Sequence, residues 1–245
     1  MIKRITAALI LDSSLIINAY KFTRHLPVGN LKFTVERLQE LRVDEIIILN
    51  SSHTDDPHSD FRKMYDDLGS LYISTPIAYG GGIISRIQAA DIVKSGADRI
   101  VVSARVLFSG EELAGIGDVL GEQAIIIHLP IILQGSEFKV LNFEDASFDS
   151  IIDKIPQNWG GELLLSIVDR DGAETPNWDL VESALPKLGN SMRVILCSGF
   201  SKPEDILRGL EVEMVQAVAI GNFLHRTEVS ISFIKKSLAT RVQVR

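Results

Sequence analysis

Cysteine is almost absent from this sequence, in which Cys197 is the only one among 245 residues. A single cysteine excludes an internal disulfide and is typical of proteins that work in a reducing compartment. Cys197 ends the apolar run 194–196, where a cysteine most often acts as a small buried hydrophobe. We therefore expect a cytoplasmic protein that is held together by its core rather than by covalent links.

Long apolar runs and an excess of basic residues are also missing. No stretch of about 18 apolar residues is present, and the amino terminus shows no apolar segment followed by a cleavage site. The 25 basic residues are outnumbered by 32 acidic ones, which gives a net charge of −7, whereas nucleic-acid binding needs a clustered basic surface. The sequence therefore predicts neither a membrane partner nor a nucleic-acid partner.

A repeated pattern connects two glycine-containing segments of the chain. Gly81 and Ser103 are 22 positions apart, and so are Gly199 and Gly221. In each copy an apolar run ends in glycine, a helix-like segment follows, and a second apolar run ends in small residues. Such a unit exposes backbone N–H groups close to a helix N-terminus, where a phosphate is readily held. The repeat predicts a barrel built from two halves.

Eight short runs rich in β-branched residues alternate with helix-like segments. Such runs are typical of strands covered on both faces, and a length of 245 residues suits a (β/α)₈ TIM barrel. We expect one domain over residues 1–245, with an open doubly wound sheet as the weaker competitor. Ser201 and Glu204 are spaced as a capping box around Pro203. The expected strands are 5–11, 45–49, 77–79, 99–102, 124–128, 163–168, 194–197 and 217–220, with helices such as 32–41, 86–95 and 202–209.

Five short motifs resemble those of the cyclase subunit of imidazole glycerol phosphate synthase, and the likeness runs from Met1 to about Leu238. They are Lys3-Arg4-Ile5, Val43-Asp44-Glu45, Gly80-Gly81-Gly82-Ile83, Gly96-Ala97-Asp98-Arg99 and Asp169-Arg170-Asp171-Gly172. The resemblance implies a subunit that takes ammonia from a glutaminase partner. It implies that this ammonia closes an imidazole ring on a phosphoribosyl-formimino aminoimidazole carboxamide nucleotide. A family resemblance indicates the fold more firmly than the reaction.

The family's two catalytic aspartates are missing from this chain. At the first strand Ile10 occupies the aspartate position, and at the fifth strand Pro130 does. Neither side chain can transfer a proton, so we expect the family cyclase reaction to be lost or severely weakened. Asp12, expected beyond the end of the first strand, and His128 are the remaining weak candidates. The catalytic residues are otherwise unknown.

The resemblance also implies two phosphate sites at the carboxyl ends of the strands. In the second, Phe200 replaces a family glycine, and its ring would crowd a phosphate or displace the loop. We therefore favour the first site and expect a ligand with one phosphate or diphosphate group. The first site comprises Gly81, Gly82, Ser103 and Ala104, and the second comprises Asp171, Gly172, Ser198, Gly199, Gly221 and Asn222.

At the opposite end of the barrel, the family's charged ring is kept. In the family these residues form a gate of alternating charge through which ammonia enters, and an aspartate beside it faces the glutaminase. The gate positions here hold Arg4, Glu45, Arg99 and Glu162, and the partner-facing aspartate is Asp98. Bottom-face residues of barrels more often serve stability alone. The retention of this end beside the loss of both acids is nevertheless the sharpest functional signal in the chain.

We interpret the chain as an enzyme subunit that receives ammonia from a glutamine amidotransferase, as a heterodimer, and delivers it to a phosphorylated or nucleotide-linked sugar. Related barrels without the acid pair resemble ammonia-delivery subunits of bacterial surface-polysaccharide pathways. The first alternative is the ordinary histidine-pathway cyclase, and the second is a catalytically silent scaffold that activates a glutaminase. No cofactor or metal is expected, because the polar loop with His53, Asp55, Asp56, His58 and Asp60 lacks zinc-ligand spacing.

Overall fold

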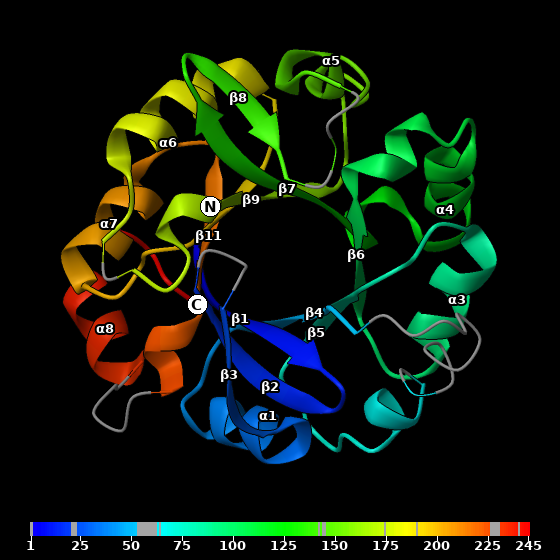
Figure 1. The fold of residues 1–245 in the computed structure, drawn as a ribbon. Coiled ribbons are helices and arrows are strands. Elements are labelled where there is room, and N and C mark those ends of the chain that lie inside the picture. Colours follow the sequence, from blue (N-terminus) through cyan, green and yellow to red (C-terminus); the bar gives the residue numbers. More distant parts are fainter. Residues whose placement is uncertain are drawn as a thin grey trace.

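The computed structural model contains a closed barrel of eight parallel strands (Figure 1). It describes residues 2–20, 24–52, 63, 65–141, 143, 146–173, 175–189, 191–225, 231–239 and 241–245. Each barrel strand pairs with the next, and the last pairs with the first, so the eight strands form a closed ring. In barrel order the strands are β1 (Arg4–Asp12), β4 (Glu45–Asn50), β5 (Ile77–Gly80), β6 (Arg99–Ser103), β7 (Ile125–Gln134), β9 (Glu162–Ile167), β10 (Val194–Cys197) and β11 (Val215–Ile220). The prediction of a (β/α)₈ barrel is confirmed, and the open sheet is excluded.

Side chains alternate between the inside of the barrel and the layer beneath the helices. In β1, Ala8 packs with the inner cluster, whereas Ala7 and Leu9 join the large outer core. The inner cluster consists of Ile47, Ala78, Val101, Ile126, Leu164, Ile195, Ala217 and Ala219, with Ala8, Leu49 and Cys197 beside it. The continuous apolar runs of the sequence arise because both faces of each strand are covered.

Helices surround the barrel (Figure 1) and cover its outer face. The three helices predicted by name are present, but the predicted capping box is wrong. Lys202 rather than Ser201 is the N-cap of α7, no side chain bonds the cap, and Ser201 is buried. The helices are α1 (Leu31–Glu40), α3 (Arg86–Lys94), α4 (Glu112–Leu120), α5 (Phe148–Ile152), α6 (Trp178–Ala184), α7 (Pro203–Glu211) and α8 (Ile231–Leu238), with 3₁₀ turns η1 (Ala104–Phe108), η2 (Glu122–Ala124), η3 (Val168–Arg170), η4 (Leu185–Leu188) and η5 (Asn222–His225).

Three antiparallel strands were not predicted from the sequence. β2 (Leu15–Tyr20) and β3 (Arg24–Asn30) form a ribbon on the end of β1, and β8 (Glu137–Val140) pairs with the end of β7. Because β1 and β7 are the first strands of the two half-barrels, both halves extend one strand beyond the rim in the same way. The ribbons thus repeat the two-half plan that the glycine spacing predicted.

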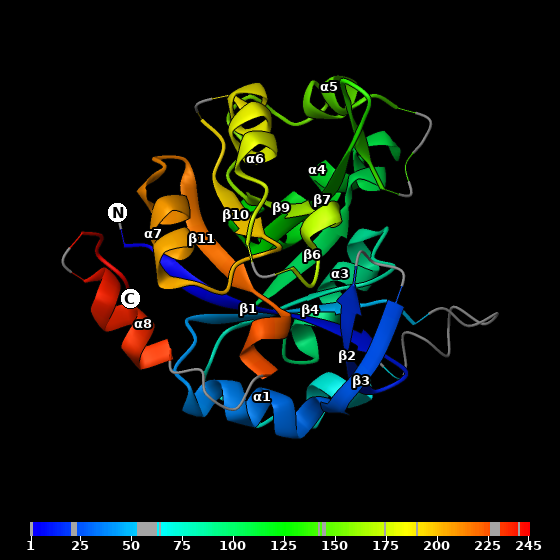
Figure 2. The ribbon, with the colours of Figure 1, turned by 60° about the vertical axis from the view of Figure 1, so that its left-hand side comes forward.

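The ends of the described chain lie at the amino-terminal end of the barrel. Lys3 forms a β-bridge with Val244, and the N–H of Arg245 donates to the carbonyl of Lys3 at 3.1 Å. Figure 2 shows both ends on the side of the barrel opposite the β2–β3 ribbon. We call this end the floor and the end with the ribbons the mouth. Within the described residues, no helix has the length and apolar character needed to cross a membrane.

Candidate functional site

The floor is closed by a ring of four charged side chains. Each is the first residue of its strand, in β1, β4, β6 and β9. Arg4 contacts Glu45 at 3.1 Å and Glu162 at 2.5 Å, and Arg99 contacts the same two carboxylates at 3.0 and 2.6 Å. Every member therefore touches both of its neighbours of opposite charge.

Mutual attraction keeps this ring charged although it is mostly buried. Burial by itself disfavours the charge on Arg4, but Glu45 and Glu162 outweigh it and raise the pKa of the guanidinium above its ordinary value. Burial likewise opposes the charge on Glu162, and Arg99 and Arg4 nevertheless lower the pKa of that carboxyl. The ring is thus one coupled unit with no net charge.

Asp98 has a structural task as well as an exposed position. Its Oδ2 accepts a hydrogen bond at 2.8 Å from the N–H of Ile77, the first residue of β5. Asp44 does the same for the N–H of Ile5, also at 2.8 Å, but is buried and pairs with Lys235 at 2.7 Å. Asp98 is exposed at the floor, so its carboxylate remains accessible beside the ring.

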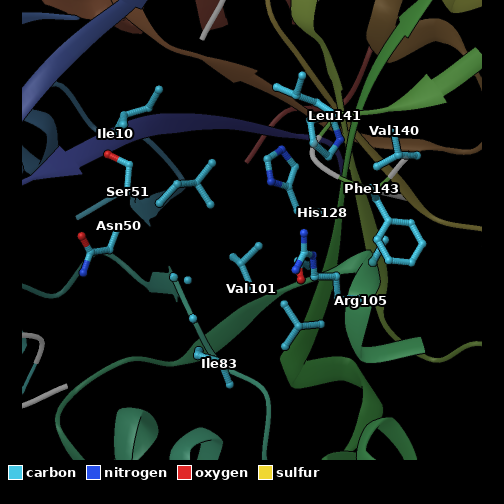
Figure 3. Close-up of a pocket in the computed structure, with 18 of the residues that line it drawn as sticks. Ile10, Asn50, Ser51, Ile83, Val101, Arg105, His128, Val140, Leu141 and Phe143 are labelled. Atoms are coloured by element: carbon cyan, nitrogen blue, oxygen red, sulfur yellow. The ribbon is translucent and has the colours of Figure 1, made fainter. Parts of the chain in front are cut away.

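The mouth contains a cavity of about 480 Å³, which we call the large cavity (Figure 3). Ile10 and Pro130, the residues that the resemblance sets at the two acid positions, both line it. His128 points into the same space from β7 (Figure 3). Asp12 is the last residue of β1 rather than beyond it, accepts a hydrogen bond from Ser13, and does not line this cavity.

His128 is a neutral side chain in this setting. Its Nε2 lies 2.9 Å from Oγ of Ser166 in β9, which is its side-chain partner. Burial lowers the pKa of His128 to about 4, because no neighbouring carboxylate compensates for the lost hydration. Burial also raises the pKa of the Cys197 thiol to about 11, with a smaller contribution from Asp171. Neither group is charged near neutral pH.

All four residues predicted for the first phosphate site line the large cavity. Gly81 has a φ of +137°, and a Cβ there would lie 2.6 Å from the carbonyl oxygen of Asn50, so this strand end requires glycine. Gly82 differs, because nothing lies within 4 Å of where its Cβ would be. Open space beside a backbone at the end of a strand is what an anion needs, and Ser103 is exposed next to it. Phosphate binding at this position stays a prediction.

The second predicted phosphate site encloses much less space. Its six residues line a cavity of only about 50 Å³, which we call the small cavity, together with Ile10 and Phe200. Phe200 is 3% exposed and packs edge-on against Trp178 at a ring distance of 6.0 Å. The ring also reaches α7, where a Cβ on Gly209 would lie 3.4 Å from it. Phe200 is thus a core residue that lines the small cavity.

Comparison with known proteins agrees with this arrangement. Residues 16–230 match the model of the family described as "Histidine biosynthesis protein". The chain belongs to this family. Two similar proteins are each named "Putative imidazole glycerol phosphate synthase subunit hisF2": that of Vibrio vulnificus is 25% identical over 99% of this chain and 88% of its own length, and that of Campylobacter jejuni is 26% identical over 96% and 95%. "Imidazole glycerol phosphate synthase subunit HisF" of Dictyoglomus turgidum is 23% identical over 96% of this chain and 95% of its own.

This member of the histidine biosynthesis family has cavity residues that sequence reasoning missed. Arg105, from η1, lines the large cavity opposite Asn50 and Ser51 of the β4 end (Figure 3). Phe143 adds an aromatic wall. The sequence did contain one indication of its role, because Arg105 follows directly after Ser103 and Ala104 at the end of a strand.

The structure offers no metal centre within the residues that it describes. No group of three or more His, Cys, Asp or Glu side chains in that part of the chain is arranged to hold an ion. The loop with His53, Asp55, Asp56, His58 and Asp60 lies outside the described residues.

Proposed function

We propose that this chain is a cyclase-like synthase subunit that receives ammonia from a glutamine amidotransferase and delivers it to a phosphorylated or nucleotide-linked sugar at the mouth. One observation carries the proposal: the charged ring of the floor is complete, whereas the two acid positions of the mouth hold Ile10 and Pro130. A barrel that retains the gate and lacks the acids is suited to passing ammonia to an acceptor that needs no such acids.

The charged ring is suited to the passage of a small neutral molecule. Each arginine has two carboxylate partners, so one contact can open while the other keeps the charge paired. Above the ring the barrel is lined by an apolar cluster. Ammonium would lose its hydration there, and neutral ammonia loses far less, so the interior selects the reactive form.

The mouth suits an acceptor with one phosphate group. The large cavity combines the open backbone at Gly82 with the exposed Ser103 and the cation of Arg105. Arginine is well matched to phosphate, because its planar donors can bind two oxygens at once. The small cavity, at about 50 Å³, offers little room for a second phosphate.

The test follows the labelled amide nitrogen of glutamine in the complex with the glutaminase. Glutamine with a labelled amide and an excess of unlabelled ammonium salt are supplied with candidate nucleotide-linked sugars. A wild-type complex is expected to place the label in the product, because the ammonia never mixes with solvent. Arg99→Ala is expected to hydrolyse glutamine and lose most of the label to dilution. Lys187→Ala, which removes the exposed pair with Asp149, is the matched control and should retain the label.

Docking is tested separately at Asp98. Asp98→Asn keeps an oxygen that can accept from the N–H of Ile77 and removes only the charge. Loss of one buried charge at an interface commonly costs about 2–5 kcal/mol, so binding of the glutaminase should weaken by at least tenfold. Unchanged affinity would place the partner elsewhere. Retained label in Arg99→Ala with the complex still formed would reject the gate.

A second candidate is the histidine-pathway cyclase itself, which the names of the relatives favour. It requires ring closure without aspartates at positions 10 and 130, with His128 as a titratable group that lines the cavity. Growth of a histidine auxotroph rescued by this chain would support it. A silent scaffold, by contrast, predicts glutaminase activation with no labelled product from any acceptor.

A further inference from the structure

Thr6 carries a buried polar atom that no described residue of the protein satisfies. The residue is 0% exposed, and its Oγ1 has no hydrogen-bond partner among the described residues. It lies in β1 between Arg4 of the floor ring and Ala8 of the inner cluster. Because alternate residues of a strand face the same side, the Thr6 side chain faces the inside of the barrel. A buried hydroxyl without a partner is destabilising, and a small ligand inside the barrel that hydrogen-bonds to it would remove this cost.

Thr6 lies between Glu45 of β4, a member of the ring, and Ala219 of β11. On the β11 side the neighbours are small, because Arg4 is paired with Ala217 as Thr6 is with Ala219. Ala8 continues the same wall. The facing strands β7, β9 and β10 instead present Ile126, Leu164 and Ile195 to the interior. A lane of small side chains thus runs from the ring along the seam between β1 and β11.

The lane ends at the mouth. Ala8 and Gly221 both line the small cavity, and Ile10 lines the small and the large cavity alike. The orphaned hydroxyl therefore lies between the charged ring and the place where the two cavities meet.

We infer that the hydroxyl of Thr6 binds neutral ammonia in transit between the floor ring and the mouth. This inference rests on the proposed function and names a binding residue on its route. A threonine hydroxyl can donate to the lone pair of ammonia and accept one of its N–H groups. The apolar walls cannot do either, so the guest is held at one point and is free to leave it.

The direct test uses ammonia as the probe. Crystals of the whole chain are soaked in ammonium chloride at alkaline pH, where neutral ammonia is abundant. Because water and ammonia scatter X-rays alike, a second crystal is soaked in sodium chloride at the same pH. Density within hydrogen-bond distance of Thr6 Oγ1 is expected only after the ammonium soak, and in neither soak of the isosteric variant Thr6→Val. An empty position, or the same density in both soaks of the wild type, would overturn the inference.

The functional test uses the labelled-glutamine complex. Thr6→Val should lower the labelled fraction of the product several-fold, and Thr6→Ser should restore it. Thr6→Val should also unfold at a higher urea concentration than the wild type, which shows that the loss does not come from misfolding. Full label in Thr6→Val beside a loss in Arg99→Ala would overturn the inference at Thr6 and keep the proposed function. Full label in both variants would reject the proposed function itself.

Discussion

The floor and the mouth of this barrel differ in how their residues depend on one another. At the floor, four charges are mostly buried, and each is paired with two others of opposite sign. At the mouth, Ile10 and Pro130 face an open cavity of about 480 Å³ and depend on no partner. Residues that share a buried charge network can only change together, whereas residues that line an open space can change singly. A barrel of this kind can therefore change the side chains of its mouth while its floor is kept.

The largest expected effect concerns the closure of the imidazole ring of the family's product. Fast closure by this chain would contradict the contrast between floor and mouth. General acid–base catalysis contributes about 10²–10⁴-fold for each group, and both groups are absent here. We expect negligible ring closure by this chain with the family nucleotide and saturating ammonium salt. The double variant Ile10→Asp with Pro130→Asp should raise the rate. Turnover near a typical value of about 10 s⁻¹ by the unaltered chain would contradict the loss of the mouth chemistry.

The next effect is on stability at the floor. Glu45→Ala removes a carboxylate that is paired with both Arg4 and Arg99 and leaves two cations without it. Breaking a buried pair from one side costs about 3–5 kcal/mol. Urea unfolding measures this against Asp149→Ala, which removes the exposed partner of Lys187 and should cost at most about 1 kcal/mol. Equal costs for the two variants would show that the ring is no coupled unit.

A smaller effect is expected from pH at the mouth. The folded chain protonates His128 only near a pKa of about 4, whereas the unfolded chain does so near 6.5. Below 6.5 the unfolded state therefore binds more protons, and the free energy of unfolding falls as pH falls toward 4. Between about pH 7.5 and about pH 5 the loss should be about 2 kcal/mol, measured as the difference from His128→Gln. Parallel pH profiles for the two proteins would indicate that His128 titrates normally.

The smallest effect sharpens the comparison between the two cavities. Arg105→Ala should weaken binding of inorganic phosphate about tenfold, since a hydrogen bond to a charged group contributes about 1.5–3 kcal/mol. Arg208, which stacks on Trp178 at 4.2 Å and lines neither cavity, gives the control Arg208→Ala. Calorimetry with phosphate measures both. Equal weakening in both variants would indicate that phosphate binds by overall charge alone.

The sequence predicted the eight barrel strands because strands buried on both faces leave long β-branched runs. The ribbons escaped notice, since residues 15–20 and 137–140 pair only through the extension of β1 and β7, which is a tertiary event. The capping box failed because Ser201 is buried and the helix begins one residue later.

The candidate site was predictable where it follows strand register and not where it follows packing. The ring residues each begin a strand, and the resemblance located all four, three of them within the quoted motifs. Arg105 reaches the cavity through a 3₁₀ turn, whose direction no pattern encodes. The small side chains beside Thr6 come from β11, more than 200 positions away in the chain, so no local pattern indicates them. Phe200 was predicted to crowd a phosphate, whereas in the structure it is buried in the core.

The pairing of β1 with β11 also governs when the barrel can form. Arg4 lies opposite Ala217, and the ammonium of Lys3 donates to the carbonyl oxygens of Val212, Glu213 and Val215. These contacts join the first strand of the barrel to the last. Closing so long a loop costs entropy before any contact compensates for it, so the nascent chain keeps an unpaired edge on β1 until β11 has been synthesised. An unpaired strand edge can bind other chains and so promote aggregation. During translation this edge must therefore be covered by a chaperone, or the barrel must close rapidly once β11 has been made.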